Sequence, residues 1–426
     1  MTMVLPSAQF LLSFGLSLFV LALLVVSIGT LVMATYAWWD PSVRERTAYP
    51  ELSGAEGLSF SIIVPCRQEV EEVMRATLDA LLAQSHSDVE VIFSVGHDDP
   101  ETVAIALRLA SGDPRVRVSI DRSPVKNKPR QLNTALGMCR NDVVGVFDAE
   151  SIAAPDLLRN IDNSFRSTGA DAVQGAVQLV NYRDSWFALR NCLEYFIWFS
   201  SRLHLQQRIG FIPLGGNTVF VRRTVLEELG GWDEDCLAED CELGVRLSAL
   251  GHPITVAYSP QLATREETPD SIRSLVKQRT RWGLGFFQVY NKGLWRSLPT
   301  RRERMMARWT LLQPHLVAMT GLAVPFCLVL AIWGSMPLPV TMFAFLPLVV
   351  IATTVALEVG MLAEFGRDHH FTIRARDYAL LVVGTLPYQI LLAFASVRAY
   401  FKWRTGDLRW EKTAHSGHHL TYLEAV

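Results

Sequence analysis

Residues 143–151, VVGVFDAES, place two carboxylates directly after an uncharged run. The run from Val143 to Phe147 is apolar apart from one glycine, which predicts a short strand buried on both faces. Asp148 and Glu150 then follow at positions i and i+2, a spacing that points both side chains to the same side of extended backbone. Such a pair can bind one hard cation. An isolated pair also suits a solvated turn, but its place after a buried strand favours a metal site.

Similar short runs rich in β-branched residues occur earlier in the chain, with helical patterns between them. The other predicted strands cover residues 59–64, 89–95 and 116–120. The helical patterns include residues 72–84 and 101–110. This alternation predicts an α/β domain with a parallel sheet and crossover helices. Ligands of such sheets bind beyond the carboxyl ends of the strands, so the polar residues after each strand are candidate site residues.

Polar residues do follow these strand ends. Residues 65–69, PCRQE, come after the first strand, and Asp98 and Asp99 come after the second. The first strand is not followed by a GxGxxG motif, so a dinucleotide-binding Rossmann domain is a weak interpretation. We therefore expect an acidic site at this edge of the sheet.

The composition excludes several other classes of protein. The chain has 426 residues, of which 50% are hydrophobic and 19% are charged, so it is too apolar for an ordinary soluble protein. Its net charge of -2 gives no basic excess for binding nucleic acid, and we expect no nucleic-acid partner. The six cysteines form no CxxC pair, which argues against a disulfide framework or a zinc knuckle.

Long uncharged segments predict membrane spans. Residues 11–34 are long enough for a retained anchor, and residues 378–397 are just long enough for another span. Residues 309–357 are too long for one helix and are interrupted at residues 334–337, GSMP, which predicts two spans and a tight turn. Basic residues follow the first span and precede the second, so the positive-inside rule predicts that the intervening domain is cytosolic.

The basic residues of the C-terminal tail conflict with a simple count of spans. Three spans after a cytosolic domain would export Lys402, Arg404, Arg409 and Lys412, against the same rule. We predict that the tail is cytosolic and that one C-terminal hydrophobic segment is re-entrant or interfacial. Residues 313–315, QPH, make the start of the second run the least lipid-like part of these segments.

Two more motifs carry polar chemistry. Glu239 and Asp240 begin a helical pattern, where acids are commonly capping and dipole partners. Gln278, Arg281 and Trp282 share one helical face and offer an amide, a guanidinium and an indole to a sugar. The same helix can lie on a membrane surface with its aromatic side chains in lipid. The aromatic-rich residues 186–205 predict a second interfacial helix or a wall of an acceptor groove.

Together these motifs resemble the membrane-integrated family 2 glycosyltransferases, the group of cellulose, hyaluronan and chitin-oligosaccharide synthases, and most of all its bacterial XagB-type branch. The resemblance extends from about residue 60 to the C-terminus. It is carried by SIIVPCRQE, VGHDDPET, NKPRQLNTAL, VFDAES, IPLGGNTVFVRR, LGGWDED, AEDCELGVRL, TREETP, QRTRWGLG and WEKTAHSG. It implies a GT-A (Rossmann-like) glycosyltransferase domain, which amphipathic helices dock on the membrane beside transmembrane helices.

The resemblance also implies a role for each motif residue. Asp240 matches the catalytic base. Asp148 and Glu150 match the DxD motif that holds Mg²⁺ or Mn²⁺, although Glu150 replaces the more usual Asp and lengthens one arm by a methylene. The nucleotide and donor sugar are expected at Pro65, Glu69, Asp98, Asp99, Lys128, Asp148, Gln278 and Arg281. The acceptor is expected at Gly215, Gly216, Asn217, Glu239 and Trp282.

The expected domain organisation has five parts. They are an N-terminal anchor (1–40), a cytosolic GT-A domain (55–265), interfacial helices with QxxRW (266–305), a transmembrane region (306–401) and a tail (402–426).

The expected function is inverting transfer at the bacterial inner membrane from a nucleotide sugar, expected to be a UDP-sugar, to a growing polysaccharide that is then exported. One alternative is transfer of a single sugar to a lipid or protein acceptor. Another is a membrane receptor or transporter that binds a nucleotide without turnover. The expected partners are therefore a nucleotide sugar, a glycan or lipid-linked acceptor, and membrane lipid.

Overall fold

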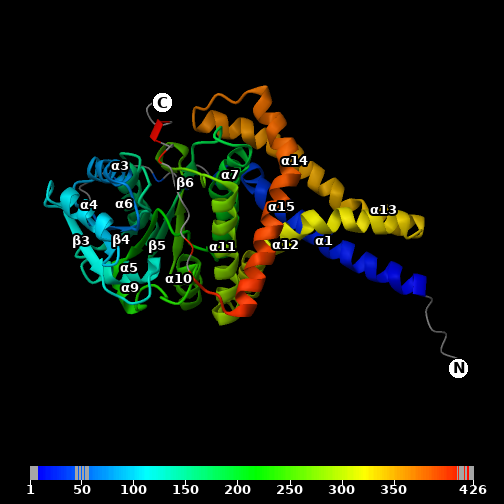
Figure 1. Cartoon of the computed structure of the whole chain (residues 1–426), viewed down its shortest axis with the longest axis horizontal. Coiled ribbons are helices and arrows are strands. Elements are labelled where there is room, and N and C mark those ends of the chain that lie inside the picture. Colours follow the sequence, from blue (N-terminus) through cyan, green and yellow to red (C-terminus); the bar gives the residue numbers. More distant parts are fainter. Residues whose placement is uncertain are drawn as a thin grey trace.

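The computed structural model of the chain describes residues 8–43, 47, 49, 52, 57–409, 411, 417 and 420–421. An α/β domain lies at one end of the molecule and long helices project from it at the other end (Figure 1). The tail motif WEKTAHSGHH falls mostly outside the described residues, as do Arg44 and Arg46 after the first helix.

The α/β domain is built on a seven-stranded sheet with the order β3-β2-β1-β4-β7-β5-β8. Its strands are β1 (Phe60–Cys66), β2 (Val89–Gly96), β3 (Val116–Asp121), β4 (Val143–Val146), β5 (Ala172–Gly175), β7 (Val219–Arg222) and β8 (Ile254–Ala257). The four predicted strands are confirmed. They pair with one another in parallel, as predicted, whereas β7, which lies outside that prediction, is antiparallel to both β4 and β5. A second sheet pairs β6 (Val177–Leu179) with β9 (Thr264–Glu266).

Helices cover both faces of the large sheet. Ile62 and Ile63 are consecutive on β1 and fully buried, yet they belong to separate hydrophobic clusters, because successive side chains of a strand point to opposite faces. The helices of this domain are α3 (Glu71–Leu82), α4 (Pro100–Ala110), α5 (Lys128–Leu136), α6 (Leu157–Thr168), α9 (Arg223–Glu228) and α10 (Glu239–Leu250). The first two confirm the predicted helices. Burial on both faces explains why these strands read as continuous apolar runs.

A layer of helices separates this domain from the projecting helices. It contains α7 (Trp186–Ile197), the π-helical turn η1 (Trp198–Arg202), α8 (Leu203–Ile209), α11 (Ile272–Lys292) and α15 (Ala375–Thr405). The short 3-10 turns η2 (Pro260–Leu262) and η3 (Leu294–Ser297) flank α11 in the sequence. Helix α15 packs against α11, α7 and α12, and Figure 1 shows it running alongside α11.

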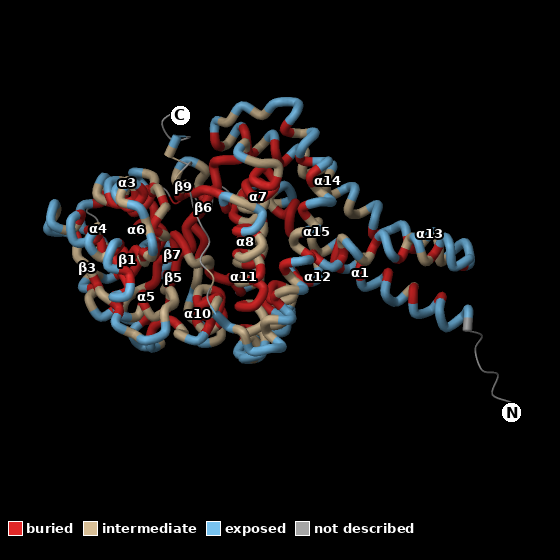
Figure 2. Tube along the Cα trace, viewed as in Figure 1, coloured by how far each residue is buried: buried red, intermediate tan, exposed pale blue. Residues whose placement is uncertain are grey.

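Four helices of the described chain are long and apolar enough to cross a membrane: Gln9–Trp39, Arg301–Trp333, Leu338–Asp368 and Ala375–Thr405. They correspond to α1 (Ala8–Trp39), α12 (Arg301–Trp333), α13 (Leu338–Ala344) with α14 (Leu346–Asp368), and α15. The interruption predicted at residues 334–337 is confirmed, but α14 continues past the predicted end at residue 357. Exposed residues run along α1 and α13 (Figure 2), and they include many large apolar side chains, as expected of a lipid-facing surface.

Candidate active site

A cavity of about 480 Å³ lies where the carboxyl ends of β1, β3 and β4 meet α10 and α11. It is lined by every predicted site residue except Asp98 and Asp99. The lining residues come from segments far apart in sequence: Pro65 and Glu69 after β1, Lys128 on α5, Asp148 and Glu150 after β4, Gly215 to Asn217 before β7, Glu239 and Asp240 on α10, and Gln278, Arg281 and Trp282 on α11. The fold therefore gathers these predicted residues around one space.

Asp98 and Asp99 lie beside the cavity instead of lining it. Asp99 is the N-cap of α4 and accepts hydrogen bonds from the backbone N–H and the hydroxyl of Thr102, at 3.3 and 2.7 Å. Asp98 forms an ion pair with Arg67, with 2.8 Å between Nη2 and Oδ2. The hydrogen bond from Arg67 lowers the pKa of Asp98. Arg67 itself lines the cavity, so Asp98 contacts a lining residue without lining the cavity itself.

Asp121 lines the same end of the cavity and was not predicted. It is the last residue of β3 and is buried. Its Oδ1 accepts hydrogen bonds from the backbone N–H and the hydroxyl of Ser123, at 2.9 and 2.6 Å. Its buried Oδ2 has no hydrogen-bond partner among the described residues. An acid directly after the third predicted strand was the signal that could have identified it.

Three carboxylates form a cluster that could hold a metal ion. Asp148, Glu150 and Glu266 each offer an oxygen within 4.8 Å of the others. Glu266 lies at the end of β9 and accepts hydrogen bonds from Ser151 Oγ, at 2.7 Å, and from Asn217 Nδ2. Burial and the nearby charges of Asp148 and Glu150 raise its pKa well above the usual value. This donor set fits Mg²⁺ or Mn²⁺, since a divalent cation would relieve that repulsion.

Lys128 joins the carboxylate cluster to the loop before β7. Its Nζ donates to Asp148 Oδ1 at 2.5 Å and to the carbonyl of Gly216 at 2.7 Å. Burial alone lowers the pKa of this amine, but the carboxylates of Asp148, Glu239 and Asp240 outweigh that effect and raise the pKa above its usual value. Lys128 is therefore a fixed positive charge in the cavity.

Glu239 and Asp240 occupy the first turn of α10. The N-cap of this helix is Ala238, which has no side-chain cap, so neither acid serves as the N-cap. Burial raises the pKa of both, that of Glu239 to about 7, and the charge of Asp240 also raises the pKa of Glu239. The backbone N–H of Cys241 donates to Asp240 Oδ1 at 2.7 Å. The pair is thus less acidic than ordinary surface carboxylates.

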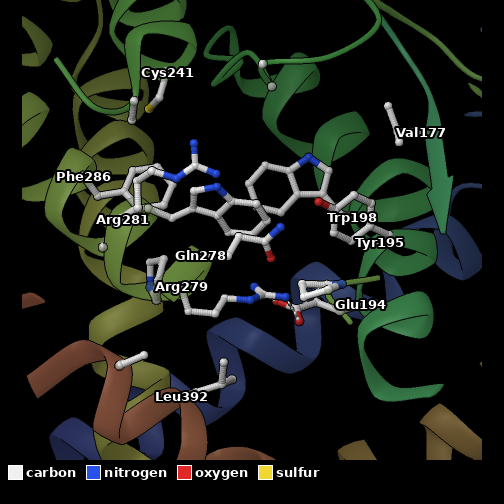
Figure 3. Close-up of a pocket in the computed structure, with 18 of the residues that line it drawn as sticks. Val177, Glu194, Tyr195, Trp198, Cys241, Gln278, Arg279, Arg281, Phe286 and Leu392 are labelled. Carbon is white, nitrogen blue, oxygen red and sulfur yellow. Dashed lines mark hydrogen bonds and ion pairs between the residues drawn. The ribbon is translucent and has the colours of Figure 1, made fainter. Parts of the chain in front are cut away.

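Helix α11 presents its motif face to the cavity. Figure 3 shows Gln278 and Arg281 directed toward Trp198, whereas Arg279 extends toward Glu194. The ring centroid of Trp282 lies 6.5 Å from that of Tyr195, and both residues line the cavity, so α7 forms part of its wall. Gly285 makes this arrangement possible, because a Cβ atom there would lie 2.5 Å from the Cβ of Ala238. The glycine allows α11 to pack against the loop that carries Glu239.

Comparison with known proteins agrees with this geometry. Residues 57–285 match a family model described as glycosyltransferase-like family 2. The chain is 27% identical over 424 residues to β-monoglucosyldiacylglycerol synthase of Trichormus variabilis, and the alignment covers 96% of this chain and 86% of that protein. It is 22% identical over 289 residues to poly-β-1,6-N-acetyl-D-glucosamine synthase of Staphylococcus epidermidis, and this alignment covers 67% of this chain and 68% of that protein.

A solved structure shares the fold. The mannosyltransferase PcManGT of Pyrobaculum calidifontis, in complex with GDP-Man and Mn²⁺, superimposes with a TM-score of 0.57 at 18% identity. The match covers 91% of this chain and 99% of that one. The α/β domain therefore has the GT-A fold. With the family model covering more than half of its length, this chain belongs to the family 2 glycosyltransferases.

Proposed function

We propose that this enzyme transfers a sugar from a nucleoside diphosphate sugar to an acceptor hydroxyl, with inversion at the anomeric carbon. The observation that carries the proposal is the position of Asp240, which lines the same cavity as the carboxylate cluster and the Gln278–Arg281–Trp282 face. An acceptor hydroxyl is a poor nucleophile at neutral pH, so its attack needs a base that accepts the proton. Asp240 is that base, and direct displacement turns an α-linked donor into a β-linked product.

The leaving nucleoside diphosphate gathers negative charge as its bond to the sugar breaks. Asp148, Glu150 and Glu266 would hold Mg²⁺ or Mn²⁺, which supplies charge neutralisation at the diphosphate. Lys128 and Arg281 line the same cavity and add two cationic groups that stabilise the developing charge. The complex of PcManGT with GDP-Man and Mn²⁺ supports a divalent ion beside a nucleotide sugar.

We assign UDP as the nucleotide. Pro65, Arg67 and Asp121 line the end of the cavity at β1 and β3, where the base of a nucleotide would lie. Asp121 Oδ2 is a buried acceptor without a hydrogen-bond partner among the described residues, and the imide N–H of uracil is a donor that would satisfy it.

For the acceptor we favour a membrane lipid. The cavity continues from the carboxylates between α1, α12, α14 and α15, where apolar side chains line it: Val26, Val317, Ile351, Val355 and Leu392. Such a lining suits acyl chains better than the hydroxyls of a glycan. The relative named for glucosyldiacylglycerol synthesis covers 96% of this chain, whereas the polymer synthase covers 67%. Transfer of one sugar to a lipid is therefore the function that the geometry supports best.

Extension and export of a polysaccharide is the second candidate. It is favoured by the polar side chains that also line the membrane part of the cavity: Gln313, Thr320, Thr354 and Gln389. Incubation of the purified protein with radiolabelled UDP-glucose or UDP-N-acetylglucosamine and total membrane lipid distinguishes the two. A labelled product that is extracted into organic solvent with one added sugar supports the lipid acceptor, and a labelled product of high molecular mass contradicts it.

We further propose that the enzyme lies in the bacterial inner membrane with its catalytic domain in the cytosol and that α15 does not span. Just before α15, the carbonyl of Thr372 accepts a hydrogen bond from Tyr182 of the catalytic domain, at 3.2 Å. After α15, the backbone N–H of Gly417 donates to Glu267 of the same domain, at 2.9 Å. Both ends therefore lie on one side, and the tail is cytosolic, as expected from its charges. Helix α15 then lies at the interface, with α1, α12 and α14 as the spans.

A further inference from the structure

A cluster of charged side chains lies at the membrane end of the cavity, apart from the catalytic carboxylates. Arg279 donates two hydrogen bonds to Glu194, both at 2.8 Å, and Tyr388 donates a third to the same carboxylate at 2.8 Å. Arg190 forms an ion pair with Glu358, with 2.7 Å between Nη1 and Oε2. In these pairs each carboxylate is matched by one guanidinium.

Arg202 is a third guanidinium in this cluster, and no carboxylate of the described residues forms an ion pair with it. It is the last residue of η1 and lines the cavity. Within the part of the chain that the structure describes, its buried Nε has no hydrogen-bond partner. Burial lowers the pKa of Arg202, although the charges of Glu194 and Glu358 oppose this effect. The cluster therefore carries one positive charge in excess, which costs free energy until an anion binds.

The cluster lies on the route from the catalytic base to the membrane. In Figure 3, Cys241, the neighbour of Asp240, is at one end of the view and Leu392 of α15 is at the other. Between them come Arg281, then Gln278, and then the Arg279–Glu194 pair. An acceptor that extended along this row of side chains would carry a hydroxyl near Asp240, a negative charge near the arginine cluster and apolar chains beyond it.

We propose that Arg202, together with Arg190 and Arg279, binds the phosphate of an anionic phospholipid, and that this lipid is the acceptor. The inference rests on the proposed lipid glycosyltransferase function and specifies its substrate class. A guanidinium matches a phosphate with two parallel N–H donors, which a neutral lipid such as diacylglycerol cannot use. The phosphate would fix the lipid headgroup so that its free hydroxyl faces Asp240.

The test is equilibrium binding of lipids to the full-length protein in a neutral detergent, measured by native mass spectrometry. Phosphatidylglycerol carries a phosphate, a free hydroxyl and two chains, whereas diacylglycerol lacks the phosphate. We expect phosphatidylglycerol to bind at least about tenfold more tightly, since hydrogen bonds to a charged group contribute about that factor or more. Arg202→Gln is expected to abolish this preference, and Arg202→Lys to restore part of it.

Arg208→Gln is the matched control, because Arg208 lies on α8 and its side chain is 68% exposed. This variant should keep the preference for phosphatidylglycerol. Calorimetric titration with UDP shows whether each variant has folded. Equal affinity of the wild-type protein for the two lipids, or an unchanged preference in Arg202→Gln that binds UDP, would overturn the inference.

Three further outcomes distinguish a lipid from a soluble phosphate and separate this inference from the proposed function. Glycerol 3-phosphate binding as tightly as phosphatidylglycerol would indicate a site for a soluble phosphate and would overturn the lipid assignment. Transfer of sugar to diacylglycerol alone would leave the proposed function standing and refute the phosphate subsite. A preference for phosphatidylglycerol that depends on Arg202, with no sugar transfer to any lipid, would support the subsite and refute the proposed function.

Discussion

Gly216 lies directly against Asp240: a Cβ atom added to the glycine would lie 3.0 Å from Asp240 Oδ2. The same atom would lie 3.2 Å from Lys128 Nζ, whose ammonium bonds the carbonyl of Gly216. A side chain here would displace either the carboxylate or the ammonium. The glycine therefore determines how close the loop before β7 comes to the proposed base, Asp240.

Gly216→Ala should lower turnover by about tenfold or more, because displacement of a catalytic group by a fraction of an ångström is costly. The folded state should survive, since the clash involves side-chain ends that can move. Initial rates with a radiolabelled donor, together with thermal unfolding, measure both effects. Gly112→Ala is the control, because its nearest neighbour is a backbone oxygen at 3.5 Å. Wild-type turnover in the Gly216 variant would contradict the proposed contact.

Glu266→Gln should weaken binding of Mn²⁺ by at least about tenfold, because it removes one charged oxygen from the three-carboxylate cluster. Electron paramagnetic resonance of free Mn²⁺ measures the affinity without reference to turnover. Glu227→Gln on the surface of α9 should have no effect, since its side chain is 46% exposed. Unchanged Mn²⁺ binding in Glu266→Gln, or full activity of the wild type in excess EDTA, would refute the metal site.

The acid limb of the pH–rate profile should lie at a higher pH than it would with an ordinary carboxylate as the base. Burial raises the pKa of Asp240, and burial with the charge of Asp240 raises that of Glu239 to about 7. A base must be unprotonated to act, so a raised pKa moves the fall in kcat/KM to higher pH. Glu239→Gln removes a neighbouring negative charge and should therefore shift that fall to lower pH.

Initial rates from about pH 5 to about pH 9 test this shift, because that range brackets the titration of the pair. Thermal unfolding at each pH identifies any loss of folded protein. An acid limb that stays in place in Glu239→Gln would show that the two carboxylates do not interact in the way described.

Both ends of α15 should be inaccessible from outside the cell. Ala375 is the first residue of α15 and Leu408 follows its last turn, and both positions are exposed on the protein, so each is replaced by cysteine in turn. In a background whose six buried native cysteines are replaced by serine, a membrane-impermeant thiol reagent should label both variants only after permeabilisation. Ser335→Cys, in the turn between α12 and α13, is the control that should be labelled on intact cells. Labelling of Leu408→Cys on intact cells would make α15 a span.

The sheet could be predicted from the sequence as far as its parallel part. Strands buried on both faces give continuous apolar runs, so Ile62 and Ile63 on β1 are recognisable without knowledge of their partners. The direction of β7 could not be predicted in this way, because a strand of four residues, VFVR, carries no local signal of the strands beside which it will lie.

The candidate site was predicted where chemistry and position in the sequence coincide. Asp148 and Glu150 stand out because they follow a buried strand, and they do line the cavity. Glu266 was missed because it joins them only through long-range contacts, among them the bridge between Ile152 and Arg265 that brings β9 beside the segment after β4. Asp99 was assigned to the nucleotide, but Pro100 and Thr102 after it indicate a helix N-cap, which is its structural role.

The most direct test of the account is the turnover of Asp240→Asn. The substitution keeps the size of the side chain and removes the proton acceptor, so turnover should fall by at least about 10²-fold. Calorimetric titration with UDP and the donor sugar should give nearly the wild-type affinity, because Asp240 is proposed to contact the acceptor hydroxyl. Loss of turnover with intact donor binding is the predicted result. Retention of more than about a tenth of wild-type turnover would contradict the assignment of Asp240 as the base.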